Sequence, residues 1–257
     1  MSKAMPRSRE ALGAPADDAL TDGLARRLRP CGASKTFDMA AIHEENQTAS
    51  RTPAGGGMDA AAAAGIVESL ARALELHDYR RGRFGETAAH TNRVTRLGRR
   101  LTELVAPELV SDPQLAAGFR LHDIGMIGIP LDILAKQGSL TSDELNEVRE
   151  HPWLGERIVA PLECMNGLAR QVIASHHERW DGSGYPHGLQ GLEIPLVARI
   201  FAVVDAFDSM TNVQPYREAL PVELALEEIN AKAGSHFEPA VVAAFLEMDG
   251  EHHPDTA

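Results

Sequence analysis

Apolar residues recur every three or four positions from about residue 58 onward, a spacing that places them on one face of an α-helix. In the stretch 61–76, Ile66, Leu70 and Leu74 follow this spacing among strong helix formers. The polar stretch "HDYRRGRFG" comes directly after them. The pattern therefore predicts a first helix that ends where this polar stretch begins.

A histidine shares the apolar face of a later predicted helix. The next helix is expected to begin near Glu86, and beyond it Leu115, Phe119 and His122 are spaced i, i+4 and i+7. Residues at this spacing lie on the same side of a helix. We therefore expect His122 to be buried with its two apolar neighbours.

Caps and prolines predict the remaining helices. Thr141 and Glu144 have the spacing of a capping box, and Pro195 suits the first turn of a long apolar helix. Three further helices are expected at 167–177, 221–233 and 239–248. Strand-like alternation persists nowhere, so we expect an all-α fold, a single helical bundle over residues 58–250.

The first 57 residues differ from the rest of the chain. They contain Pro, Gly, Arg, Ser and Ala without sustained periodicity and end in "RTPAGGGMD", which is typical of a flexible linker. We expect residues 1–57 to be a disordered or weakly structured leader.

Composition excludes several classes of protein. The chain has 257 residues, 44% of them hydrophobic, and no run approaches the roughly 20 apolar residues of a membrane span. We therefore expect a cytoplasmic protein. The net charge of −12 argues against a DNA or RNA groove, which depends on many cations. The two cysteines, Cys31 and Cys164, make no thiolate site, so any metal must be held by histidines and carboxylates.

The possible metal ligands all fall in predicted helices or at helix ends. Singly, each is more often a satisfied core or surface residue than a ligand. As a set, they place five histidines and three acids on five helical segments, several on apolar faces where an unpaired charge is costly. A cluster of divalent metals is the natural shared partner. The set is Glu86, His90, His122, Asp123, His151, His176, His177 and Asp205.

Five stretches then carry a specific pattern along residues 58–248: "HTNRV", "HDIGMIGIPLDIL", "LTSDELNEVREHPWLGERI", "HHERWDGSGYPHGLQGLEIPLVARIFAVVDAFDSMT" and "PYREAL". Their order and spacing resemble the HD-GYP family of metal-dependent phosphohydrolases. "HHERWDGSGYPHGL" alone is a highly specific match, whereas a bare His-Asp pair is weak.

The resemblance implies a helical enzyme that hydrolyses cyclic di-GMP with two or three divalent metal ions, usually iron or manganese. Imidazole and carboxylate ligands suit both metals, and zinc would accept them too. All of the candidate ligands except Glu86 match the ligand positions of the family. Glu86, in "ETAAH", matches the additional acid of members with three metals. The resemblance also implies that Asp123 is the catalytic residue that bridges two ions.

The "DGSGYPHGL" segment allows more than one interpretation. Its glycines and Pro186 could simply make a surface turn. The resemblance favours a lip beside the metal site, with Tyr185 contacting substrate. In the family this segment is also associated with binding of GGDEF-type cyclase domains, so such a cyclase is a second candidate partner.

Two positions on the substrate side depart from the family. Met126 stands where the family usually has a lysine that assists at the scissile phosphate, so a cation and proton donor are missing. Gln214 stands where an arginine is common, while Arg217 keeps the second cation. Glutamine can donate a hydrogen bond to phosphate but lacks the charge and the bidentate fork.

These departures leave three hypotheses. The first is a phosphodiesterase that converts cyclic di-GMP to pGpG or GMP, with Arg217 helping to hold phosphate. The second is a phosphohydrolase of the same fold that acts on another nucleotide. The third is a metal-loaded but catalytically weak receptor for cyclic di-GMP or a cyclase.

Overall fold

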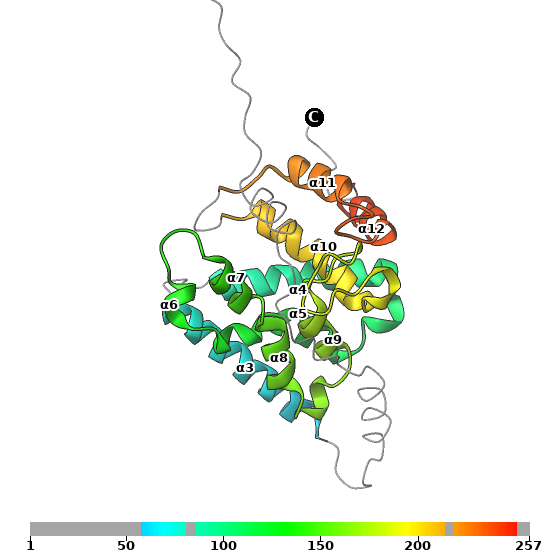
Figure 1. Cartoon of the computed structure of the whole chain (residues 1–257). Helices are drawn as coiled ribbons and strands as arrows, with labels where there is room; N and C mark the ends of the chain where they lie inside the picture. Colours follow the sequence, from blue (N-terminus) through cyan, green and yellow to red (C-terminus); the bar gives the residue numbers. More distant parts are fainter. Residues whose placement is uncertain (1–57, 81–85, 214–217, 251–257) are drawn as a thin grey trace, which may run out of the picture. The chain divides into compact units, whose positions relative to one another are not determined.

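The computed structural model describes residues 58–80, 86–213 and 218–250, and across these ranges the chain is helical without a named strand. The expected all-α fold is therefore confirmed, and the predicted leader lies outside the described residues. With the labels of Figure 1, the helices are α3 (Ala60–Arg80), α4 (Glu86–Val105), η1 (Pro107–Leu109), α5 (Pro113–Leu121), η2 (Ile124–Gly128), α6 (Leu131–Leu134), α7 (Ser142–Val148), α8 (His151–Val159), η3 (Glu163–Met165), α9 (Leu168–Ser175), η4 (Gly191–Glu193), α10 (Leu196–Thr211), α11 (Val222–Ala231) and α12 (Pro239–Gly250).

Helix α10 is the central element of the larger core. Figure 1 shows it between α11 and α12 on one side and α4 and α5 on the other, and it packs against α4, α9, α11 and α12. Its apolar residues therefore point in several directions, as expected for a helix surrounded by others. Phe201 of α10 lies 5.2 Å from Phe119 of α5, measured between ring centroids, and both rings are fully buried.

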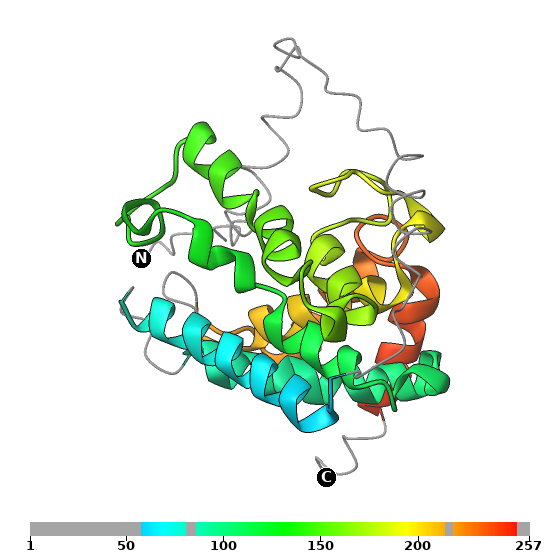
Figure 2. The ribbon, with the colours of Figure 1, turned by 90° about the horizontal axis from the view of Figure 1, so that it is seen from below.

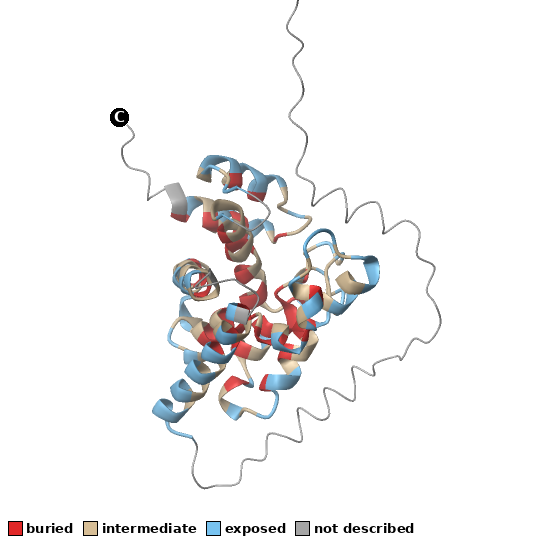
Figure 3. Cartoon of the chain, turned by 90° about the vertical axis from the view of Figure 1, so that its left-hand side faces the viewer, coloured by how far each residue is buried: buried red, intermediate tan, exposed pale blue. Residues whose placement is uncertain are grey.

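A smaller core joins α3 to α5, η2 and α9. Leu74, Leu121, Ile124 and Ile173 are buried in it. Figure 2 shows α3 running alongside α4 and α5, and in Figure 3 the buried residues lie on the faces that the helices turn toward one another. His122 follows Leu121 directly, so the two cores meet near the histidine.

The predicted boundaries hold at some helices and fail at others. Thr141 and Glu144 form both hydrogen bonds of the predicted capping box. The predicted end of the first helix is wrong, because α3 continues through the polar residues to Arg80. His, Asp, Tyr and Arg are all compatible with a helix, and the first residue that strongly disfavours one is Gly82.

Gly125 allows the backbone of η2 to lie directly against α8. A Cβ atom at Gly125 would fall 1.9 Å from the carbonyl oxygen of His151 and 2.5 Å from the amide nitrogen of Gly155. Only a residue without a side chain permits this approach. It holds Asp123, two residues earlier, beside the first turn of α8.

Among the helices that the structure describes, none combines the length and the apolar character that crossing a membrane requires.

Candidate metal centre

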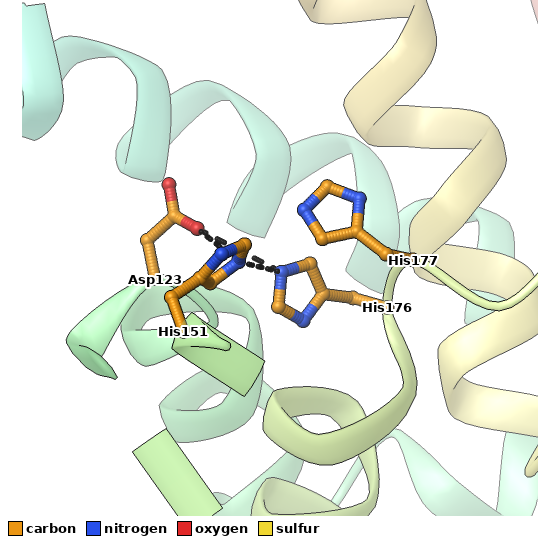
Figure 4. Close-up of side chains that lie close together, drawn as sticks. All are labelled: Asp123, His151, His176 and His177. Carbon is orange, nitrogen blue, oxygen red and sulfur yellow. Dashed lines mark hydrogen bonds and ion pairs between the residues drawn. The ribbon is translucent and has the colours of Figure 1, made fainter. Parts of the chain in front are cut away.

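Four predicted ligands form one compact group. Asp123 precedes η2, His151 begins α8, and His176 and His177 follow α9. One nitrogen or oxygen atom from each lies within 4.8 Å of the corresponding atoms of the others. Figure 4 shows the side chains converging. Four ligand atoms at this separation are able to hold a metal ion.

A second group lies beside the first. His90 of α4, His122 at the end of α5 and Asp205 of α10 also present ligand atoms within 4.8 Å of one another. The Nε2 atom of His90 lies 3.4 Å from Oδ1 of Asp205. Three different helices thus supply one ligand each.

Asp123 faces both groups. Its Oδ1 atom lies 3.2 Å from Nε2 of His151, whereas its Oδ2 atom lies 3.4 Å from Nε2 of His122. One carboxylate therefore directs a different oxygen toward each group. The structure thus brings together seven of the eight predicted ligands, all except Glu86, whose side chain lies outside the described part of the chain.

Backbone carbonyls fix the orientation of three of the histidines. Nδ1 of His122 donates to the carbonyl oxygen of Phe119 at 3.0 Å, and Nδ1 of His151 donates to that of Val148 at 2.8 Å. His176 makes the same contact with the carbonyl of Ile173 at 3.0 Å. A carbonyl can only accept, so each Nδ1 carries a proton and, in the neutral ring, Nε2 is available as a ligand.

The donor set fits a bound cation. The Nε2 atoms of His151 and His176 lie 3.1 Å apart, although the carbonyl contacts keep the proton of each neutral ring on Nδ1. Two lone pairs at this distance repel each other unless a positive charge lies between or beside them. The ionised Asp123 next to both rings leaves the group suited to a divalent ion.

The local charges favour the protonation states of metal ligands at Asp123, His176 and His177, whereas they favour a protonated His122, which must release that proton to bind an ion. Burial opposes ionisation of Asp123, but His122, His151 and His176 hold its pKa well below the usual range. Burial and the neighbouring histidines lower the pKa of His176 and, further, that of His177. Burial acts in the same direction on His122, but the adjacent Asp123 outweighs it and raises the pKa of His122 to about 9.

Tyr185 lies directly over this centre. Its ring stacks on that of His177, with 4.7 Å between centroids and an angle of 23° between the planes. The guanidinium of Arg149 lies 5.5 Å from the centre of the same tyrosine ring. The "DGSGYPHGL" segment is therefore attached to the metal centre through Tyr185.

Glu178 anchors that segment and was not among the predicted site residues. Its carboxylate is buried and accepts hydrogen bonds from the backbone N–H groups of His187, at 2.7 Å, and Leu189, at 3.1 Å. Burial raises the pKa of this carboxyl group. The signal in the sequence was an acid directly after the two predicted histidine ligands.

A cavity of about 530 Å³ opens onto the second ligand group. His90, His122, Asp123, His177 and Asp205 line one part of it. Met126 is also in the wall, so the position at which the resembled family usually has a lysine faces the cavity. The two remaining predicted substrate contacts, Gln214 and Arg217, lie outside the described residues.

Fold and site together define an all-helical protein whose buried histidines and carboxylates are able to hold metal ions. The HD domain family matches residues 44–241, and the chain belongs to this family. The expected resemblance to HD-GYP proteins is confirmed. The solved structure of Bd1817, a HDG"Y"P protein from Bdellovibrio bacteriovorus, has the same fold, with a TM-score of 0.52 and 20% identity over 64% of this chain and 52% of that one.

Curated relatives are similar over much of the helical region. A cyclic di-GMP phosphodiesterase of Thermotoga maritima is 41% identical over 65% of this chain and 45% of its own length. The 3'3'-cGAMP-specific phosphodiesterase 2 of Vibrio cholerae is 36% identical over 71% of this chain and 34% of its own length. The chain therefore spans less than half the length of each of these two relatives.

Proposed function

We propose that residues 58–250 form a metal-dependent phosphodiesterase domain that hydrolyses cyclic di-GMP to pGpG or GMP. The observation that carries this proposal is Asp123, which directs one carboxylate oxygen toward each of two adjacent ligand groups. A carboxylate in this position suits a pair of metal ions, and paired ions are common in enzymes that cleave phosphate esters. The name of the Thermotoga maritima relative supports cyclic di-GMP as the substrate.

The ligand groups would hold two divalent ions, and we propose iron or manganese. Asp123, His151, His176 and His177 would bind one ion, and His90, His122 and Asp205 would share Asp123 to bind the other. When bound, such ions neutralise phosphate oxygens, supply a nucleophile near neutral pH and stabilise the leaving oxygen. Glu86 remains a predicted ligand for a third ion.

The protein side chains have separate tasks in this proposal. The ionised Asp123 links the two ligand groups, and its two oxygens attract the imidazoles of His122 and His151. Burial, reinforced by the charge of Asp123, raises the pKa of the Tyr185 hydroxyl, so it stays protonated and remains a hydrogen-bond donor. Tyr185 and Arg149 together form an aromatic and cationic rim on which a phosphate or a base can rest.

A different nucleotide is the second candidate substrate. Met126 supplies no charge in the cavity wall, so phosphate would be held with one cation fewer than in the family pattern. The relative named for 3'3'-cGAMP supports another cyclic dinucleotide. The same uncharged wall also fits a metal-loaded receptor that binds cyclic di-GMP with little turnover, or that contacts a GGDEF-type cyclase.

Chromatography of the reaction products separates these functions. Protein purified without oxygen and loaded with Fe(II) or Mn(II) is incubated with cyclic di-GMP or 3'3'-cGAMP, and the products are resolved by HPLC. We expect pGpG or GMP from the wild type and from Asp143→Asn, a control at an exposed acid of α7, and no product from Asp123→Asn. Cleavage of 3'3'-cGAMP alone would favour the second substrate. Binding of cyclic di-GMP without any product would favour the receptor.

A further inference from the structure

Asp208 is a buried carboxylate behind the metal centre that belongs to neither ligand group. It lies on α10, one turn after Asp205, and only 1% of the residue is exposed. Its Oδ2 atom accepts a hydrogen bond from Nδ1 of His90 at 2.8 Å. Asp208 thus contacts a candidate ligand on the side of the ring that faces away from Asp205.

Two further side chains hold Asp208 in place. Arg93 donates to Oδ1 through Nε at 2.5 Å and to Oδ2 through Nη2 at 2.9 Å, so the pair is bidentate. Asn212 donates to Oδ1 at 3.2 Å. Arg93 lies one turn after His90 on α4, as Asp208 lies one turn after Asp205 on α10. The two helices therefore meet in two successive layers, the candidate ligands in one and the ion pair in the other.

His90 differs in this respect from three other histidines of the centre. His122, His151 and His176 donate through Nδ1 to carbonyls three residues earlier in the chain, so their own local backbone sets the ring orientation. The acceptor for His90 is instead a carboxylate 118 residues away. A charged acceptor also makes the imidazole a stronger ligand than a carbonyl acceptor does.

We infer that Asp208, held by Arg93, is the positioning residue for His90 and controls binding of the ion shared by His90, His122 and Asp205. This inference rests on the proposed metal centre. Among the described residues, the hydrogen bonds and ion pairs of Asp208 are with His90, Arg93 and Asn212, and none is with the ligand group of Asp123, His151, His176 and His177. Loss of the charge of Asp208 should therefore lower the metal affinity of the group of His90, His122 and Asp205 and leave that of the other group unchanged.

The chain offers a control for the loss of an ion pair that involves α10 and is largely shielded from solvent. Arg199 of α10 contacts Glu238 at 2.5 Å, with 12% and 14% of the two side chains exposed. Glu238 lies in neither ligand group. Glu238→Gln therefore removes an arginine–carboxylate ion pair that also involves α10 but changes no residue of the proposed centre.

The test is a titration of the metal-free 257-residue chain with Mn(II), followed by calorimetry and by metal analysis of the desalted protein. We expect the wild type and Glu238→Gln to bind the same number of ions per chain, at least the two that the two ligand groups would hold. Asp208→Asn should keep one ion at wild-type affinity and bind the second about 10- to 100-fold more weakly. A purely structural role for Asp208 would instead lower both affinities together, and this result would overturn the inference.

Two further outcomes are also decisive. Two ions bound by Asp208→Asn as tightly as by the wild type would refute the role of Asp208 and leave the proposed centre standing. No binding by the wild type would refute both. If Asp208→Asn does not fold, Arg93→Lys keeps a cation but loses the bidentate fork, and the same selective weakening of the second ion is expected from it.

Discussion

Replacement of Gly125 by alanine tests whether close packing of η2 on α8 sets the geometry of the metal centre. The new Cβ atom would lie 1.9 Å from the carbonyl oxygen of His151, whereas real Cβ atoms keep at least 3.0 Å from such a neighbour. The backbone must therefore move by about 1.1 Å, the difference of these two distances. The obstacle is a helix backbone and not the tip of a flexible side chain.

The expected cost follows from this displacement. Overpacking of a well-packed core typically costs about 1–3 kcal/mol of stability. Because the obstacle is backbone, we expect Gly125→Ala to lower the free energy of unfolding by about 3 kcal/mol. For a domain of this size, about 3 kcal/mol lowers Tm by roughly 6–12 °C. The same shift separates Asp123 from His151, and a misplacement of about 1 Å can reduce turnover by about 10²-fold.

Gly128→Ala is the matched control, because Gly128 lies in the same short helix. Its Cβ atom would meet Cδ1 of Leu154 at 3.0 Å, the end of a side chain that can move aside. We expect its Tm to stay within about 2 °C of the wild type, a change of less than about 1 kcal/mol. Thermal unfolding followed by circular dichroism measures both variants. Equal Tm values for Gly125→Ala and Gly128→Ala would refute the reasoning.

Three further predictions concern the cavity, the loop and the pH dependence. Met126→Lys should raise the rate of cyclic di-GMP hydrolysis at least about tenfold, the effect of one charge-assisted contact to phosphate, and an unchanged rate by HPLC would count against a limiting loss of charge. Glu178→Gln should destabilise the domain by about 1–3 kcal/mol, because one acceptor of two backbone N–H groups loses its charge; urea unfolding at the wild-type midpoint would contradict this. In chelator-treated protein, the His122–Asp123 pair should stabilise the fold fully between about pH 5 and 6.5. This contribution should fall as the pH rises through about 9, where folded His122 loses its proton, and also as acid protonates Asp123. Unfolding free energies that rise from pH 6.5 to 9 would contradict the assigned charges.

Local signals in the sequence were sufficient for much of the fold. The i, i+4, i+7 spacing of Leu115, Phe119 and His122 predicted a buried histidine, and the structure buries all three. The capping box at Thr141 was equally local, since both partners lie within three residues. Such features depend on helix geometry alone, so they can be read without knowledge of the tertiary structure.

Contacts between residues far apart in the chain could not be predicted from the sequence in this way. Asp208 has an ordinary position on an apolar helix, and nothing near it in sequence indicates that its partners are His90 and Arg93 on α4. The paired i, i+3 spacings on the two helices become informative only once α4 and α10 are known to pack together. The anchoring role of Glu178 depends likewise on the path of the loop that follows it.

Different contacts hold the histidines of the centre and the side chains of the cavity wall. The orientation of His122, His151 and His176 depends on backbone carbonyls three residues earlier in the chain, so a change of side chain in the cavity wall leaves it undisturbed. Met126 is half-buried against the smaller core and lines the cavity at the same time. The stem of a lysine could follow the same apolar wall and present its ammonium to the cavity. Under the proposed function, position 126 would set the charge that the cavity wall offers to a substrate, whereas the hydrogen bonds from backbone carbonyls orient the histidines of the metal centre.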